Sequence, residues 1–361
     1  MLRLQFVLFQ ADESGRLFVA NTLPSLRTAL LLLDNAVELL LDCRIGNEIQ
    51  DDQMQRAIQT RAIKAGIPSD HPDFSGLLSR EFLSKSEVAK VARLFDEKLK
   101  FVSEDRRIID ADVASVLSHI HRYRNESYHG GRVRPGILRT TVAIQLHIVC
   151  DLVKTLRPGS AGYSSDDDFS WLRSRFDLDP SQLWTDTTLS RVLSEIRNAA
   201  KLTDQSISTA LAENLEERIA DLDEAIDFIL TETDQFKTPV AAMKAAQSYT
   251  LDALKRETPY PPPPRFIEQP IDGSEIDRIR GVPTTILSST DRMTALSSFA
   301  AADTSLDRLE YVLRELGGAI DARIQHEIDL ARGKLRLSSP SRRGPTVWRG
   351  LTSEVDRPLS E

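Results

Sequence analysis

The longest regular pattern of apolar residues lies in the second half of the chain, and a similar pattern follows nearer the C-terminus. The first consists of Ile207, Leu211, Leu215, Ile219, Leu222, Ile226 and Ile229, and the second of Leu306, Leu309, Leu313, Leu316, Ile320 and Ile324. Apolar residues three or four positions apart share one side of an α-helix, whereas a half-buried strand needs strict alternation. The two patterns are most simply the core-facing sides of a helical hairpin, and a partner-binding coiled coil is the alternative.

The N-terminal half contains three shorter patterns with the same helical spacing. They are Leu26, Leu30, Leu33, Val37 and Leu40; Val113, Leu117 and Ile120; and Val142, Leu146, Val149 and Val153. The first ten residues differ, because Leu2, Leu4, Phe6 and Leu8 alternate and predict one short strand that pairs with residues 16–21. The sequence therefore predicts an all-α protein with at most one short N-terminal β-hairpin.

Stretches rich in Gly, Ser, Asp or Pro divide the chain, which at 361 residues is long enough for about two domains. A run of prolines near residue 260 cannot be helical, because proline lacks the backbone donor that a helix needs. We expect an N-terminal helical domain at 1–157, a linker at 158–170, a helical region at 171–258, a Pro-rich linker at 259–275, a long-helix region at 276–335 and a flexible tail at 336–361.

Composition limits the location and the partners of the protein. A net charge of −8 disfavours broad nucleic-acid binding, which needs a basic surface, so any such site must be local. Two cysteines provide no disulfide framework and no cysteine-rich metal site. The first residues lack a secretory signal pattern, and charged residues or histidine interrupt the apolar runs too soon for a membrane span. We expect a cytoplasmic protein without membrane partners.

The segment RYRNESYHGG, residues 122–131, has the composition of a functional helix end. Two glycines favour a helix C-cap, so the helix that starts near Asp112 is expected to end near His129. The apolar stripe of this helix continues to Arg124, where a charge replaces an apolar residue. Burial of an unpaired charge is costly. We expect Arg124 either to meet a carboxylate, with Glu38 and Asp34 as candidates, or to line a cleft for an anion.

A basic island surrounds this segment, since residues 119–139 contain five arginines and one acid. An arginine and a histidine beside one phosphodiester suffice for RNA cleavage without a metal, through the 2′-hydroxyl as nucleophile. His129 lies about 140° from Arg124 around an ideal helix. The two converge if the helix frays at the glycines, or if a second copy supplies the complementary group.

Arg124, Asn125 and His129 match the R-x4-6-H signature of the HEPN superfamily, which the first 155 residues or so resemble. These small helical domains occur in bacterial toxin-antitoxin and antiphage systems, and they dimerise to form a composite, metal-independent ribonuclease site. The resemblance implies that Arg124 and His129 are catalytic and that Asn125 orients them. We expect Glu38, Asp34 and Tyr128 to support the site, and we expect the basic island to bind RNA through Arg122, Arg132 and Arg134. Some members carry a modified tyrosine two residues after the histidine; this chain has Gly131 there and Tyr128 beside the histidine.

The resemblance implies an endoribonuclease that acts as a homodimer or higher oligomer under an inhibitor or activator protein. Other interpretations of the same residues stay open. Arg124 and His129 are, in the simplest alternative, a buried ion pair and a helix-capping histidine. The protein would then be a non-catalytic dimerisation module, or a nucleotide-sensing regulator. No cofactor or metal is expected, because His119 and His121 diverge by about 200° on a helix.

Overall fold

The protein is described by a computed structural model that covers residues 2–68, 71–72, 74–129, 134–157, 168–179, 182, 185–256, 263–264 and 266–332, without the side chains of Leu2, His129 and Asp204. Within these residues every regular element is helical and no strand occurs, which confirms the all-α fold class. The elements are α1 (Leu2–Ala20), α2 (Leu23–Lys64), α3 (Ser75–Leu78), α4 (Lys85–Arg93), α5 (Phe95–Lys100), a π-helical turn (Phe101–Asp105), α6 (Ala111–His129), α7 (Pro135–Leu156), α8 (Ser170–Phe176), α9 (Asp186–Ala199), α10 (Asp204–Glu232), α11 (Pro239–Leu254), α12 (Gly273–Ser288) and α13 (Arg292–Ala331).

The expected N-terminal β-hairpin is wrong, because residues 2–20 form α1. Leu4, Val7, Leu8 and Ala11 are buried, and their spacing of three, one and three residues fits a helix. Phe6, which alternation would place with Leu4 and Leu8, is 49% exposed. The short alternating run fits both periods, and packing against the neighbouring helices selects the helical one.

Helix α2 carries the first predicted apolar stripe and extends well beyond it. The hydroxyl of Thr22 caps the helix by accepting a hydrogen bond from the backbone N–H of Ser25 at 3.3 Å, and Pro24 occupies the first turn. All five stripe residues are buried. The helix runs for 42 residues to Lys64, and Gly66 then adopts a φ of +74°, which glycine tolerates without steric cost.

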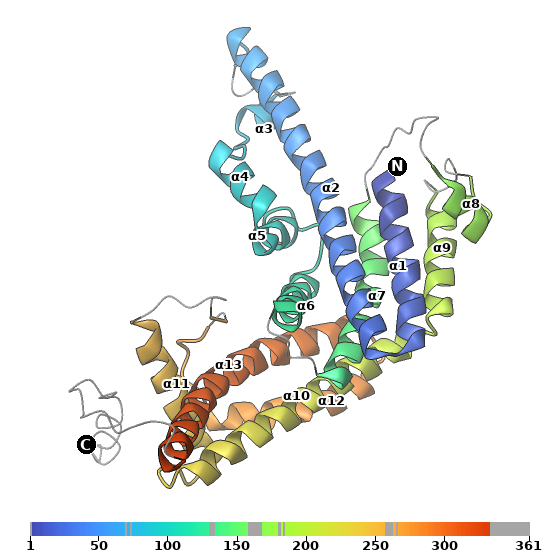
Figure 1. The fold of residues 1–361 in the computed structure, drawn as a ribbon. Helices are drawn as coiled ribbons and strands as arrows, with labels where there is room; N and C mark the ends of the chain where they lie inside the picture. Colours follow the sequence, from blue (N-terminus) through green and yellow to red (C-terminus); the bar gives the residue numbers. More distant parts are fainter. Residues whose placement is uncertain are drawn as a thin grey trace. The chain divides into compact units, whose positions relative to one another are not determined.

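Helices α1, α2 and α7 pack side by side and form the core of the N-terminal region (Figure 1). Helix α1 also contacts α9. At Gly15 the approach is close, since a Cβ there would lie 3.2 Å from that of Ala200. Among the described residues, α7 alone is long and apolar enough to cross a membrane, and 83% of its most apolar window is buried inside the protein. Core helices of soluble proteins have the same property.

The motif helix, α6, runs from Ala111 to His129, which confirms the bounds expected from the sequence. Before it, the carboxylate of Asp110 accepts a hydrogen bond from the backbone N–H of Asp112 at 2.8 Å. Helix α5 contacts both α2 and α6. An extended Leu94 separates α5 from α4, so residues 85–100 form two short helices in place of one longer helix.

Contacts divide the chain into two units, unit 1 with Met1–Asp223 and Pro264–Leu309, and unit 2 with Glu224–Pro263 and Glu310–Glu361. The predicted domain 1–157 therefore lies in unit 1 together with α8, α9, α12 and the first parts of α10 and α13. Unit 2 has its own buried apolar residues, among them Ile226, Ile229, Met243, Leu313 and Ile320. Most of the linker expected at 158–170, part of the Pro-rich linker at 259–275 and all of the tail at 336–361 lie outside the described residues.

Candidate active site

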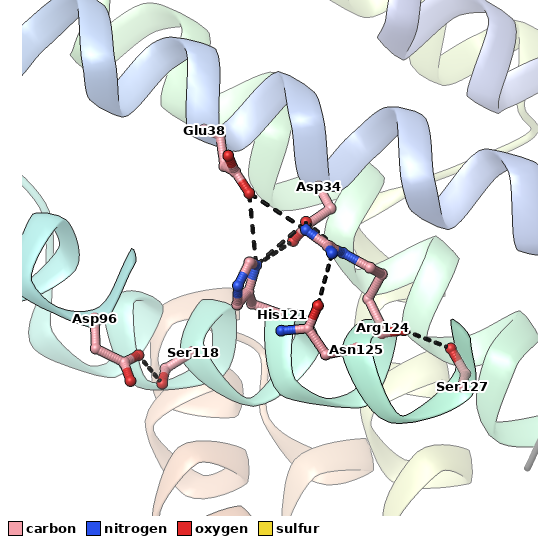
Figure 2. Close-up of polar contacts among 8 residues, drawn as sticks. All are labelled: Asp34, Glu38, Asp96, Ser118, His121, Arg124, Asn125 and Ser127. Atoms are coloured by element: carbon pink, nitrogen blue, oxygen red, sulfur yellow. Dashed lines mark hydrogen bonds and ion pairs between the residues drawn. The ribbon is translucent and has the colours of Figure 1, made fainter. Parts of the chain in front are cut away.

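Helices α2 and α6 bring Arg124 and Asn125 of the motif close to two carboxylates and a second histidine (Figure 2). Asp34 and Glu38 are one turn apart on α2. His121, Arg124 and Asn125 are three and four positions apart on α6, so they share the face that lies against α2. The site is thus built from two helices whose contacting residues lie nearly 90 positions apart in the sequence.

Arg124 meets both carboxylates that the sequence offered as its partners. Its Nε donates to Oδ2 of Asp34 at 2.7 Å, and a terminal nitrogen donates to the same oxygen. That nitrogen also lies 3.3 Å from Oε1 of Glu38, while the other terminal nitrogen donates to Oδ1 of Asn125 at 2.6 Å. The Asp34 side chain is only 2% exposed. A guanidinium with this many partners is held in a fixed orientation.

His121 joins the same carboxylate, a contact that the sequence motif does not predict. Its Nδ1 lies 3.0 and 3.2 Å from the two carboxylate oxygens of Asp34. Its ring stacks on Phe95 of α5, with the centroids 3.9 Å apart and the planes at 10°. The signal that could have identified it is position, because His121 precedes Arg124 by three residues and therefore faces α2 as Arg124 does.

A pocket of about 340 Å³ adjoins Arg124 at the N-terminal end of α2. Its walls carry apolar side chains together with two arginines, and it is lined by Leu23, Pro24, Arg27, Thr28, Leu30, Leu31, Arg124, Ser127 and Tyr128. Arg27 donates to the backbone carbonyl of Ser127 at 3.3 Å, which ties the end of α6 to α2. Tyr128 is 58% exposed at the rim. Apolar groups therefore reach solvent directly beside the paired guanidinium.

The remaining motif residues have different surroundings. His129 is the last residue of α6, but its side chain lies outside the described part of the chain, as does all of Arg132. Arg122 pairs with Asp307 of α13 at 2.8 Å, and Arg134 pairs with Asp221 of α10 at 2.5 Å. Two of the three arginines expected to contact RNA are thus already neutralised by acids from later helices.

Tyr123 anchors the start of α7 from within the motif. Its hydroxyl donates to the backbone carbonyl of Arg134 at 3.4 Å. Burial raises the pKa of this tyrosine to about 12. This contact ties α6 to the residue that precedes α7.

The opposite side of α6 contacts a buried charged cluster from α10 and α13. Nδ1 of His119 lies 2.9 Å from Asp307 and 3.3 Å from Asp303, and Arg218 pairs with both carboxylates. Burial raises the pKa of Asp303. Burial also opposes the charge of Asp307, but His119 and the two arginines beside it outweigh this effect and lower the pKa of that carboxyl. His119 and His121 thus contact separate carboxylates on different helices, as their divergence on α6 predicts.

Two groups of side chains offer ligand atoms close enough together for a metal ion. One is Asp34, Glu38 and His121, and the other is His119, Asp303 and Asp307; in each, the atoms lie within 4.8 Å of one another. In the first group Arg124 pairs with the carboxylates, and in the second Arg218 does so. A cation would have to compete with a guanidinium that already neutralises its ligands.

Comparisons with known proteins identify no relative of this chain. No family model matches the chain, and searches of curated proteins and of solved structures find no match.

Proposed function

We propose that this protein is a metal-independent endoribonuclease of the HEPN type. It would cleave RNA through the 2′-hydroxyl at a site shared by two copies, and it would act in bacterial defence as a toxin or abortive-infection effector. The observation that carries the proposal is the guanidinium of Arg124, held by Asp34 and Glu38 at the wall of a pocket, five residues before His129. An oriented guanidinium stabilises the negative charge that develops on a phosphorane.

In this mechanism the 2′-oxygen attacks phosphorus and the bond from phosphorus to the 5′-oxygen breaks. A histidine near the scissile linkage moves protons between the two oxygens, and Arg124 neutralises the non-bridging oxygens. Asn125 holds the guanidinium in place through its carbonyl oxygen. The products carry a 2′,3′-cyclic phosphate and a 5′-hydroxyl, and DNA, which lacks the 2′-hydroxyl, is not cut.

A second copy of the chain would complete the site. Each chain has one Arg-Asn-x3-His unit, and apolar side chains reach solvent next to it: Leu23 is 43%, Leu31 36% and Tyr128 58% exposed. Exposed apolar groups around a polar centre are typical of protein interfaces. Because unchecked RNA cleavage harms the host, the proposal also implies an inhibitor or activator protein in the cytoplasm.

The test is incubation of purified protein with total RNA in the presence of a chelator. Cleavage is expected for the wild type and is expected to be lost in both Arg124→Ala and His129→Ala. Arg278→Ala, which changes a solvent-exposed arginine of α12, is the matched control and should cleave normally. RNA that stays intact with the wild type, or that is cleaved equally by all variants, would contradict the proposal.

One observation favours a second candidate, a non-catalytic dimerisation or interaction protein. All three nitrogens of the Arg124 guanidinium already donate to Asp34, Glu38 or Asn125, an arrangement that also serves to fasten α2 to α6. In that case the wild-type protein would not cleave RNA, and Arg124→Ala would only lower the stability of the protein. The RNA cleavage assay with a chelator therefore separates the two candidates.

A further inference from the structure

We infer that His121 is a proton-transfer residue of this site, with Asp34 as the group that orients it and the 2′-hydroxyl of RNA as the group from which it takes a proton. The inference rests on the proposed ribonuclease function and adds a histidine that the R-x4-6-H motif does not contain.

The contact with Asp34 fixes which ring nitrogen is available. A neutral imidazole carries a proton on one nitrogen and a lone pair on the other. Nδ1 faces both oxygens of the Asp34 carboxylate, which can only accept, so Nδ1 holds the proton. Nε2 then presents its lone pair, and it has no hydrogen-bond partner among the described residues. A carboxylate behind a histidine plays this part in other general bases.

The ring is held in place and still reaches solvent. Phe95 stacks on one face of His121, and the side chain of His121 is 19% exposed. Figure 2 shows one ring nitrogen directed at Asp34 and the other directed away from it. His119, two residues earlier, has Nδ1 between Asp303 and Asp307 on the other side of α6, so it lacks contact with the Arg124 site.

One buried carboxylate orients both the proton acceptor and the charge stabiliser. Oδ2 of Asp34 accepts from Nε of Arg124 at 2.7 Å, and Oδ1 lies 3.0 Å from Nδ1 of His121. Glu38 is 3.9 Å from Nδ1 and 3.3 Å from Arg124. Among the described residues, the charged groups that face His121 are Asp34 and Glu38 from α2 and Arg124 from α6. Asp96 of α5 lies nearby, where it accepts a hydrogen bond from Ser118.

The 2′-oxygen forms a bond to phosphorus while its proton passes to Nε2 of His121, and the bond from phosphorus to the 5′-oxygen breaks. The 5′-oxygen takes a proton from a second acid, for which the proposed function has His129, and the imidazolium of His121 later releases its proton to solvent. No electron is transferred and no metal is needed.

The test measures RNA cleavage in the presence of a chelator by two variants, His121→Gln and His326→Gln. The second is the control, because it changes an exposed histidine of α13. General-base catalysis contributes about 100-fold or more, so we expect His121→Gln to lower kcat by about that factor and to leave KM unchanged. His326→Gln should match the wild type. Added imidazole should restore part of the activity of His121→Ala, which a folding defect would not allow.

A second readout needs no activity. Nitrogen NMR of the neutral His121 side chain should find the proton on Nδ1 in the wild type, and this preference should weaken in Asp34→Asn. Wild-type kcat in His121→Gln, with Arg124→Ala inactive, would overturn the role of His121 alone. Wild-type protein that leaves RNA intact would overturn the proposed function together with this inference.

Discussion

The carboxylate of Asp34, in the middle of α2, accepts a hydrogen bond at 2.7 Å from Nε of Arg124, near the end of α6. Asp34 is almost fully buried, and Arg124 is 21% exposed. A pair of this kind contributes little net stability relative to an apolar pair of the same shape, but loss of one partner leaves a buried charge alone. The pair therefore makes the position of Arg124 depend on α2.

Replacement of one partner of this pair should lower the stability of the folded protein. We expect Asp34→Asn to lower the free energy of unfolding by about 3–5 kcal/mol, because the Arg124 guanidinium loses its main buried counter-charge. Urea denaturation followed by circular dichroism measures the change. Asp277→Asn, at an exposed position of α12, is the control and should stay within about 0.5 kcal/mol of the wild type. Equal effects of the two substitutions would contradict this account of the site.

The two residues should also be coupled. In a double-mutant cycle, Asp34→Asn and Arg124→Gln together should cost less than the sum of the single substitutions, by about 0.5–3 kcal/mol. The reason is that the second substitution removes the charge that the first one left without a partner. Additive single effects would mean that the contact between Asp34 and Arg124 carries no energetic weight.

The buried cluster on the other side of α6 predicts an acid-dependent stability. The pKa of Asp307 is lowered in the folded state, so its charge stabilises the protein above the unfolded value of about 3.9, and this contribution is lost as pH falls below it. Asp307→Asn should therefore destabilise the protein at pH 7 and have a smaller effect at pH 3. Denaturant titrations at the two pH values measure this. A deficit that is independent of pH would contradict the assignment.

Tyr123 predicts the opposite behaviour at alkaline pH. Burial raises its pKa to about 12, above the unfolded value of about 10, so its contribution to stability is present below pH 10 and is lost between pH 10 and 12. In an absorbance titration of the folded protein, one tyrosine should ionise near pH 12, and this step should be missing in Tyr123→Phe. Loss of a step near pH 10 in that variant, in place of the step near pH 12, would show that Tyr123 ionises normally.

The exposed apolar rim of the pocket predicts a change in assembly. Leu31→Asp should convert the expected dimer to a monomer in light-scattering measurements and abolish RNA cleavage, because the substitution places a charge in the proposed interface. Ile63→Asp, at an exposed position near the other end of α2, is the matched control and should stay dimeric. A wild-type protein that is monomeric and active would contradict the composite site.

Part of this arrangement is predictable from the sequence, because local rules govern it. Apolar spacing and the glycine pair place α6 between residues 111 and 129. The high cost of an unpaired buried charge gives Arg124 a carboxylate partner on α2. Asp34 and Glu38 are the candidates because they interrupt the apolar stripe of that helix. Periodicity and charge burial are properties of one helix and its nearest neighbour.

Other features depend on tertiary packing and could not be predicted. The helix α1 follows from contacts with α2, α7 and α9, which an alternating run of residues does not reveal. The pairs Arg122–Asp307 and Arg134–Asp221 join residues far apart in the sequence. The sequence therefore does not show that acids from later helices neutralise two arginines of the basic island. The position of His121 over Phe95 depends on how α5 turns after Leu94.

The most direct measurement of the central claim uses one RNA oligonucleotide and the same sequence with 2′-deoxy sugars, each incubated with the wild-type protein and a chelator. The account predicts that the RNA is cut, that its fragments end in a 2′,3′-cyclic phosphate, that the deoxy strand stays intact, and that Arg124→Ala cuts neither. Cleavage of both strands, or RNA fragments with a 3′-hydroxyl, would contradict a reaction through the 2′-hydroxyl, and an intact RNA strand would contradict the nuclease itself.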